Sequence, residues 1–245
     1  MRVRGYAPGV PCWAELTCPD PESGAAFYGG VFGWTAYDGT FRRDGLAVAG
    51  VRAGEPRWLP YVSTEDVAAT AAAVTSAGGT AGEARSDPRG GYAACADPSG
   101  ARFGVRQPGT LAGAQVVNEF GTVLWADLVT TDLAAADPFY AAVFGWTRRP
   151  IDYGDGFLYH EWVSAGRPVA GGREMAAPEP FPPHWMTTLL VADCADTVRR
   201  AESLGGAVAL PPTPAAVGTY AMVADAQGAA FGVIELIPRF LADMS

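Results

Sequence analysis

Residues 27–35 read Phe-Tyr-Gly-Gly-Val-Phe-Gly-Trp-Thr, and residues 139–147 read Phe-Tyr-Ala-Ala-Val-Phe-Gly-Trp-Thr. Seven of the nine positions are identical, and the two stretches lie 112 residues apart (139 − 27). The same spacing separates Trp13 from Trp125. A repeat of this length in two copies indicates a duplicated domain, because a solenoid would need at least about three repeats.

Further along the chain the spacing grows to 127, as between Trp58 and Trp185 (185 − 58). About fifteen additional residues (127 − 112) therefore lie between Trp146 and Trp185 of the second copy. We predict two domains, residues 1–110 and residues 118–245, each large enough to bury a core.

The composition is typical of a globular protein, with 49% apolar and 18% charged residues among 245. No apolar stretch approaches the roughly 18 residues of a membrane span, and no hydrophobic segment follows the N-terminus. The four cysteines show no CxxC spacing and are expected to be reduced thiols in a cytoplasmic protein. The net charge of −9 argues against a nucleic-acid or membrane partner.

Each copy is predicted to contain two units of the order strand, helix, strands. In the first unit, residues 12–18 alternate as a half-buried strand does, and Asp20 with Pro21 begins a helix that Gly33 ends. Three short strands follow, separated by Asp-Gly turns. In the second copy we expect the proline at Pro138 to divide the corresponding helix. The predicted class is α+β, with four βαβββ units.

This order, with the Phe-Tyr-x-x-Val-Phe-Gly-Trp helix and the closing Asp97-Pro-Ser-Gly turn, resembles the vicinal oxygen chelate superfamily. That superfamily includes glyoxalase I, extradiol dioxygenases and bleomycin-resistance proteins, and the chain is most similar to two-domain glyoxalase-like proteins of actinomycetes. The resemblance implies tandem glyoxalase-like domains whose paired units form half-open barrels with the site on the concave face.

The resemblance also implies where metal ligands would stand. Active members place His or Gln seven residues before the helix-capping Asp, and Glu seven residues after the turn Asp. Two ligands from each of the paired units leave open coordination positions on a divalent metal for the substrate. The residues at those positions here cannot serve as ligands: Trp13, Leu59, Gly104, Trp125, Met186 and Gly232. We therefore expect no metal and no other cofactor.

Only two histidines are present, His160 and His184, both in the second copy. The alternative of a non-standard divalent-metal site there, with Glu161, Asp127 or Glu235 as further ligands, remains open. The simpler interpretation is that His184 flanks a strand end and that His160 lies on a strand with its ring partly solvated.

Side chains in phase with the lost ligands are expected on the concave face, since strand residues alternate. Aromatic walls with a few polar groups describe a small-molecule pocket, although the two tryptophans could equally plug the barrels. The candidate ligand-binding residues are Trp13, Tyr61, Arg102, Trp125, His160, Trp185 and Thr188.

Glu15 and Asp127 occupy equivalent positions on otherwise apolar strands, where a buried carboxylate is costly unless it is paired or functional. Glu15 could pair with Arg102 or Arg106. A general acid or base with a raised pKa is the alternative. The candidate catalytic residues are Glu15, Asp127 and His184.

The second copy is the favoured location of a functional site, because its insertion adds aromatic residues near the expected cleft: Tyr153, Phe157, Tyr159, Trp162 and Phe181. The leading hypothesis is metal-independent binding of a small hydrophobic or aromatic molecule, as in resistance proteins that sequester a compound. The alternatives are a cofactor-free lyase, isomerase or cyclase, and a metal enzyme. The expected partner is a small molecule, and the chain is expected to be a monomer or a homodimer.

Overall fold

The first copy of the repeat forms one curved sheet of nine strands in the computed structural model, which describes residues 1–152, 159–175 and 181–242. Its order is β2-β3-β4-β1-β5-β9-β8-β6, with β7 paired to β8. The bounds are β1 Pro11–Cys18, β2 Thr35–Tyr37, β3 Thr40–Arg43, β4 Leu46–Ala53, β5 Arg57–Ser63, β6 Thr80–Ala81, β7 Arg85–Asp87, β8 Gly90–Ala96 and β9 Arg102–Pro108.

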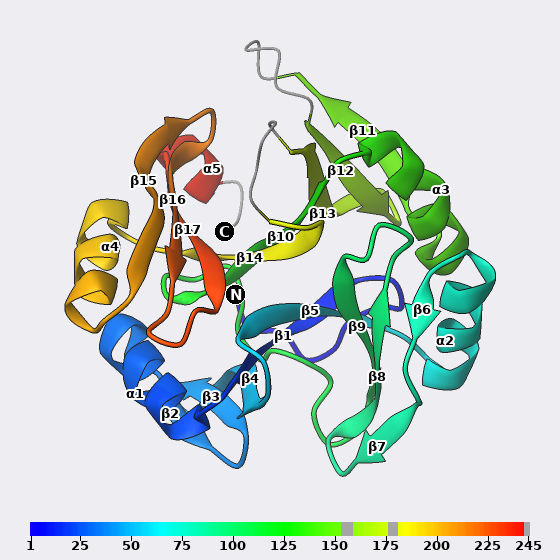
Figure 1. Cartoon of the computed structure of the whole chain (residues 1–245), viewed down its shortest axis with the longest axis horizontal. Coiled ribbons are helices and arrows are strands. Elements are labelled where there is room, and N and C mark those ends of the chain that lie inside the picture. Colours follow the sequence, from blue (N-terminus) through cyan, green and yellow to red (C-terminus); the bar gives the residue numbers. More distant parts are fainter. Residues whose placement is uncertain (153–158, 176–180, 243–245) are drawn as a thin grey trace.

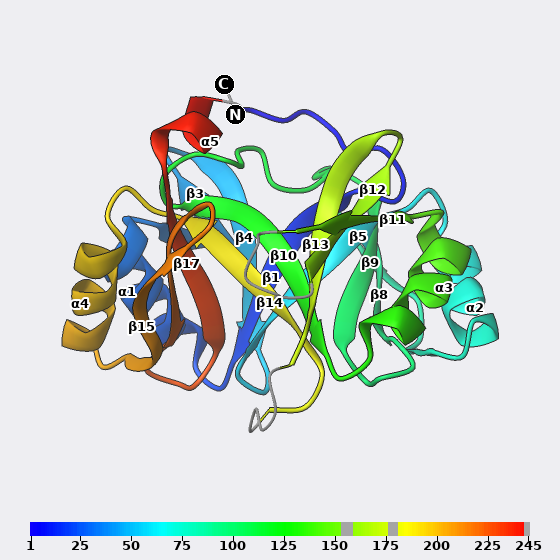
Figure 2. The ribbon, with the colours of Figure 1, turned by 90° about the horizontal axis from the view of Figure 1, so that it is seen from above.

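The second copy forms a sheet of eight strands with the equivalent order β11-β12-β13-β10-β14-β17-β16-β15. The bounds are β10 Thr122–Thr130, β11 Thr147–Ile151, β12 Tyr159–Ser164, β13 Arg167–Glu174, β14 His184–Leu190, β15 Ala207–Ala215, β16 Gly218–Ala224 and β17 Ala230–Leu236. Figures 1 and 2 show the central strands of the two sheets lying back to back, with the sheets curling away from each other. The predicted α+β class with four βαβββ units is confirmed.

One helix follows the first strand of each unit: α1 Pro21–Phe32, α2 Val67–Ser76, α3 Leu133–Phe144 and α4 Cys194–Ser203, and α5 Pro238–Ala242 follows the last strand. Each of the four unit helices is capped by an aspartate whose side chain accepts backbone N–H bonds of the first turn. Gly33 ends α1 in the left-handed conformation (φ 73°), as predicted. None of the helices in the described ranges is long and apolar enough to cross a membrane.

The expected break at Pro138 is wrong, because α3 runs through this proline without interruption. Asp132 caps the helix by accepting a bond from Ala135 N (2.9 Å). Phe139 and Tyr140, which directly follow the proline, are buried in the core. Their burial outweighs the one backbone hydrogen bond that proline removes.

The hydrophobic cores join the two copies. In one core, α1 with β1 and β4 packs against α4 with β16 and β17; in the other, α2 with β8 and β9 packs against α3 with β12. Figure 1 shows the two helix pairs, α1 beside α4 and α2 beside α3, at opposite sides of the molecule. Each core therefore contains one unit from each copy.

The repeated motif supplies reciprocal hydrogen bonds across these cores. Tyr28 of the first copy donates to Asp225 Oδ2 of the second (3.1 Å), and Tyr140 of the second donates to Asp97 Oδ2 of the first (2.9 Å). The indole N–H of Trp58 in turn donates to the Tyr28 hydroxyl (2.7 Å). The residues that repeat most clearly are thus those that hold the copies together.

Candidate functional site

Strand alternation divides each sheet into a core face and a concave face. On β1, Ala14 and Leu16 are buried in the core, whereas Trp13 and Glu15 face the other way. The equivalent strand of the second copy, β10, follows the same rule and turns Asp127 to its concave face. Glu15 and Asp127 therefore lie on the concave faces of their sheets, as predicted.

The positions of the expected metal ligands are closed by neighbouring side chains. A Cβ atom at Gly104 would overlap the ring of Tyr61, and one at Gly232 would lie 2.7 Å from both Thr188 Oγ1 and the Tyr220 hydroxyl. A glutamate at either position would have to displace its neighbour. Nor does any group of three His, Cys, Asp or Glu side chains in the described ranges come together as a metal site would require. The residues present do not fit the family's divalent metal.

The first cleft is filled around its centre. Trp13, Leu59 and Tyr61 are buried together with Ala114 of the segment that links the two copies. Trp13 therefore belongs to a small core that fills the first barrel. This agrees with the alternative that the tryptophan plugs the barrel. Arg106 covers the Trp13 ring, with its guanidinium carbon 5.7 Å from the ring centre, and donates to the Arg89 carbonyl (3.0 Å).

Glu15 is held by an ion pair, but not with either arginine expected from the sequence. Its Oε1 accepts from Arg52 Nε (2.5 Å) and from the Tyr61 hydroxyl (3.0 Å). Arg102 and Arg106 as partners are therefore wrong. The correct partner lies on β4, which runs parallel to β1, with Gly50 opposite Glu15. A parallel neighbour of this kind carries no signal in local sequence.

The tryptophan beside the acid is more exposed in the second cleft than in the first. Trp125 and Asp127 both keep partial solvent exposure, whereas Trp13 is only 6% exposed. Asp127 Oδ1 accepts from the indole N–H of Trp125 (3.1 Å) and from the Tyr159 hydroxyl (2.9 Å). No hydrogen bond among the described residues engages Oδ2. One carboxylate oxygen is thus fixed by two aromatic donors, while the other accepts no hydrogen bond from a described residue.

The protein around Asp127 raises the pKa of this carboxyl to about 6, chiefly because burial disfavours the charged form. The hydrogen bond from Tyr159 and the nearby Arg173 act in the opposite direction. The side chain keeps a path to solvent, yet protein atoms surround it on most sides. A carboxyl with this pKa changes its charge near neutral pH.

The floor of the second cleft is formed by β14 and β17. Met186 and Thr188 lie opposite Asp127 and Trp125 on the neighbouring strand and are buried. Thr188 Oγ1 lies near the Tyr220 hydroxyl, but the two do not meet the geometry of a hydrogen bond. The floor is therefore mainly apolar, with hydroxyl groups from two side chains.

Two further candidates, His160 and Trp185, lie on the core face of the second sheet. Their assignment to a cleft is therefore wrong. The His160 ring is 3% exposed, not partly solvated, and packs 4.6 Å from Trp162 with Nε2 3.4 Å from Asp137 Oδ1. Trp185 donates to the Tyr140 hydroxyl (3.0 Å) in the core. Burial lowers the pKa of His160.

His184 begins β14 in phase with Met186 on the concave side, and its Nδ1 lies 2.9 Å from the Pro182 carbonyl. His160 and His184 are therefore on opposite faces of the sheet and cannot join one metal site. Arg102 lies at the exposed end of the first cleft. Tyr153 and Phe157 fall outside the described residues.

The pKa of Asp127 predicts an unusual pH dependence of stability. Because this pKa lies above the roughly 3.9 of an unfolded chain, the Asp127 carboxyl contributes stability that is fully present below about pH 4 and is lost as the pH rises through 6. Asp127→Asn lacks this loss, so between pH 4 and pH 7.5 its free energy of unfolding should gain about 2 kcal/mol over the parent protein. Urea unfolding at several pH values measures the difference. Parallel pH profiles of the two proteins would contradict the prediction.

Four βαβββ units in two curled sheets, with a candidate pocket on a concave face, define the vicinal oxygen chelate class of folds. A model of the glyoxalase-like domain matches residues 13–106, and a model of the glyoxalase/bleomycin resistance protein/dioxygenase superfamily matches residues 122–233. The chain belongs to this superfamily, as a two-domain member.

Its relatives carry two kinds of name. It is 38% identical to the "Anthracycline biosynthesis protein DauV" of Streptomyces sp. (strain C5), over 94% of each chain. It is 30% identical to the "Putative glyoxylase CFP32" of Mycobacterium bovis, over 96% of this chain and 97% of that one. The full length of the chain is thus matched.

Solved structures share the fold at low identity. The Mn(II)-bound glyoxalase from Novosphingobium aromaticivorans gives a TM-score of 0.63 at 18% identity, covering 93% of this chain and 82% of that one. Homoprotocatechuate 2,3-dioxygenase from Arthrobacter globiformis gives 0.64 at 15% identity, covering 95% and 82%. At this identity the likeness concerns the fold alone.

Proposed function

We propose that the second cleft binds a planar aromatic molecule without a metal ion. The observation that carries this proposal is the Trp125–Asp127–Tyr159 cluster, in which a partly exposed indole stands beside a carboxylate with one oxygen unused. Aromatic surface with a few convergent polar groups is the usual composition of a small-molecule site.

Each member of the cluster has a distinct part in binding. The Trp125 ring offers a face on which an aromatic ring can stack, a contact of about 0.5–1.5 kcal/mol beyond the area it buries. Asp127 Oδ2 can accept a hydrogen bond from a ligand hydroxyl. Tyr159 and the Trp125 N–H hold the carboxylate in place, so little ordering is needed when the ligand arrives.

The names of the relatives support an aromatic ligand. Two of them are described as anthracycline biosynthesis proteins, from Streptomyces sp. (strain C5) and Streptomyces peucetius. An anthracycline contains a planar, hydroxylated fused-ring quinone, which combines a stacking surface with hydrogen-bond donors. A ligand of this chemical class matches both Trp125 and Asp127.

A second candidate function follows from the pKa of about 6 at Asp127. A carboxyl that titrates near neutral pH can take a proton from a bound molecule and return it, which is the work of a general base in a cofactor-free isomerase or cyclase. In that case Oδ2 receives the proton, since Oδ1 is already occupied by two donors.

The test uses 1,4-dihydroxyanthraquinone as a fluorescent probe of the intact protein. Trp125→Leu should weaken its binding about tenfold, because the stacking face is lost. Trp13→Leu is the matched control at the equivalent position of the first cleft and should leave the affinity unchanged. Failure of the probe to bind below 1 mM, or equal affinity of Trp125→Leu and the parent protein, would overturn the proposal.

Asp127→Asn separates the two candidate functions. For a binding protein, this variant changes affinity only modestly and the probe is recovered unaltered by mass spectrometry. For an acid–base enzyme, substrate analogues with an acidic C–H are converted by the parent protein, and Asp127→Asn binds them without conversion. Glu15→Gln, which alters the equivalent carboxylate of the first cleft, should convert them as the parent protein does.

A further inference from the structure

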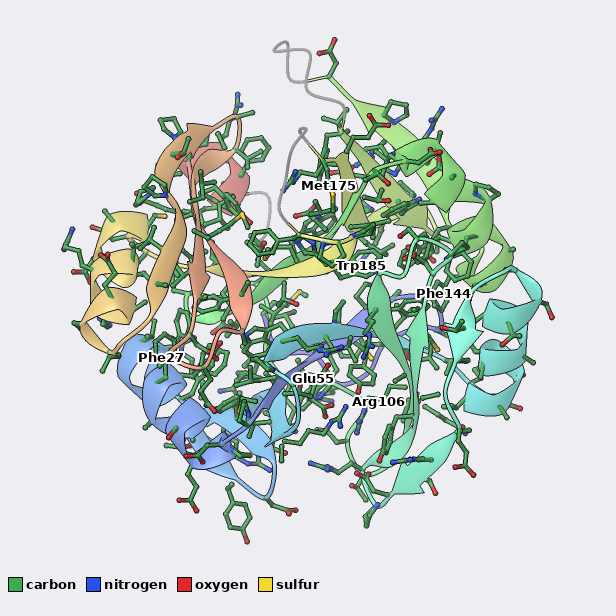
Figure 3. All side chains as sticks on the ribbon, in the orientation of Figure 1. Phe27, Glu55, Arg106, Phe144, Met175 and Trp185 are labelled. Carbon is green, nitrogen blue, oxygen red and sulfur yellow. The ribbon has the colours of Figure 1, made fainter. Side chains whose placement is uncertain are left out.

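Three arginines surround a pocket at one end of the first cleft. Its volume is about 170 Å³, whereas a single water site needs roughly 10–15 Å³. Arg52, Arg57 and Arg102 line it from three different strands, and Leu59 and Ala94 add apolar surface. Glu55 also lines this pocket, and Figure 3 labels it in the half of the molecule that contains the first sheet.

Two of the three arginines are already paired. Arg52 is bonded to Glu15, and Arg57 forms an ion pair with Glu55. Arg102 forms no hydrogen bond or ion pair with any residue that the structure describes. The pocket therefore contains one guanidinium whose charge is not compensated locally, beside two others that are held in position by acids.

This concentration of like charge is unfavourable to the empty protein. The pKa of Arg57 is lowered, first by burial and then by the charges of Arg102 and Arg52. Like charges at close range destabilise one another unless an anion lies between them. An arginine fork matches a carboxylate geometrically, and such charge-assisted hydrogen bonds are the strong ones.

The second copy shows that the fold does not require arginine at two of these three positions. The residues equivalent to Arg52, Arg57 and Arg102 are Arg173, His184 and Ala230, at the same register of the second sheet. The second sheet closes in the same strand order with only one arginine at these three positions. A purely structural role therefore does not explain the cluster.

We propose that this pocket binds the carboxylate group of a small organic acid, with Arg102 as the principal partner. One uncompensated guanidinium fits a monoanion better than a phosphate dianion. The apolar surface of Leu59 and Ala94 suits the organic part of such a ligand. This site is separate from the aromatic site proposed in the second cleft.

The experiment is calorimetric titration of the intact protein with acetate, benzoate and 2-naphthoate. Benzamide, the neutral analogue of benzoate, and inorganic phosphate are titrated for comparison. We expect one carboxylate to bind per chain and benzamide to bind at least tenfold more weakly. Absence of binding of all three acids below 10 mM, or tighter binding of phosphate than of every carboxylate, would overturn the proposal.

Arg102→Gln should weaken carboxylate binding about tenfold or more, because a hydrogen bond to a charged group is lost. Its melting temperature should not fall, since Arg102 has no partner among the described residues and its removal relieves the repulsion of Arg57. Arg199→Gln removes an exposed arginine of α4 and is the charge-matched control. Equal affinities of Arg102→Gln and Arg199→Gln would refute the assignment. Asp127→Asn should bind the acid normally, which keeps this test independent of the second cleft.

Discussion

Residues 1–110 and residues 118–245, produced as two separate polypeptides, are each expected to be unfolded as monomers and to fold when mixed. Each polypeptide can pair its own strands, because each sheet lies within one copy. Neither polypeptide can complete a core, because each of the two large cores is built from one unit of each copy. The two helices of the same copy cover only part of the core face, and the loss of the other copy exposes the rest of the burial that stabilises it.

Circular dichroism and denaturant titration of the separate and mixed polypeptides check this expectation. The mixture should regain a cooperative unfolding transition that depends on concentration, as for a heterodimer. If one polypeptide folds by forming a homodimer, this also agrees with the expectation, since a second copy of the same polypeptide can offer a surface similar to that of the missing half. Cooperative unfolding of either half as a monomer would contradict the expectation.

Asp225→Ala is expected to lower the free energy of unfolding by about 3 kcal/mol or more. Asp225 is 4% exposed and accepts bonds from Tyr28 Oη, Gln227 N and Ala229 N. Its removal leaves these donors without an acceptor, and each buried donor left unsatisfied costs about 1–3 kcal/mol. Asp97, which the first copy uses in the same way for Tyr140, should respond similarly to alanine.

Urea unfolding of three variants isolates the effect. Tyr28→Phe removes one of the bonds to Asp225 and also the acceptor of the buried Trp58 N–H, and should cost about 1–3 kcal/mol. Asp196→Ala removes an exposed acid of α4 that pairs with Arg199 and Arg200, and should cost at most about 1 kcal/mol. A loss for Asp225→Ala no larger than that for Asp196→Ala would contradict this prediction.

The fold could be predicted because the residues that repeat in the sequence are the ones that build the cores. Tyr28, Trp34 and their counterparts recur at a fixed spacing because each core needs the same aromatic cluster and the same hydrogen bonds. The prediction that each copy buries its own core is wrong, because each of the two large cores combines one unit of each copy. Spacing along the chain says nothing about which units pack together.

The candidate site could be predicted only in part. The alternation of β1 and β10 places Glu15 and Asp127 on the concave faces, so their strands were interpreted in the correct phase. His160 and Trp185 were assigned to the wrong face. Trp185 alternates with Met186 and Thr188, which face the cleft, and His160 alternates with Tyr159, so both point into the core. Tyr159 was expected near the second cleft, but its bond to Asp127 was not. Arg52 reaches Glu15 from β4, the parallel neighbour of β1, and Tyr159 and Tyr220 reach the second cleft from β12 and β16, which lie two strands away from β10 and β14. The sequence carries no local signal for such an arrangement.

The glycines at the positions where the family places a glutamate also limit which metal ligands this chain can accept. Tyr61 occupies the space above Gly104, and Tyr220 and Thr188 occupy the space above Gly232, so a glutamate at either glycine collides with a neighbour until that neighbour becomes smaller. A glutamate at either glycine would therefore need a second substitution at the neighbouring side chain, and the acidic substitution alone would give a strained protein.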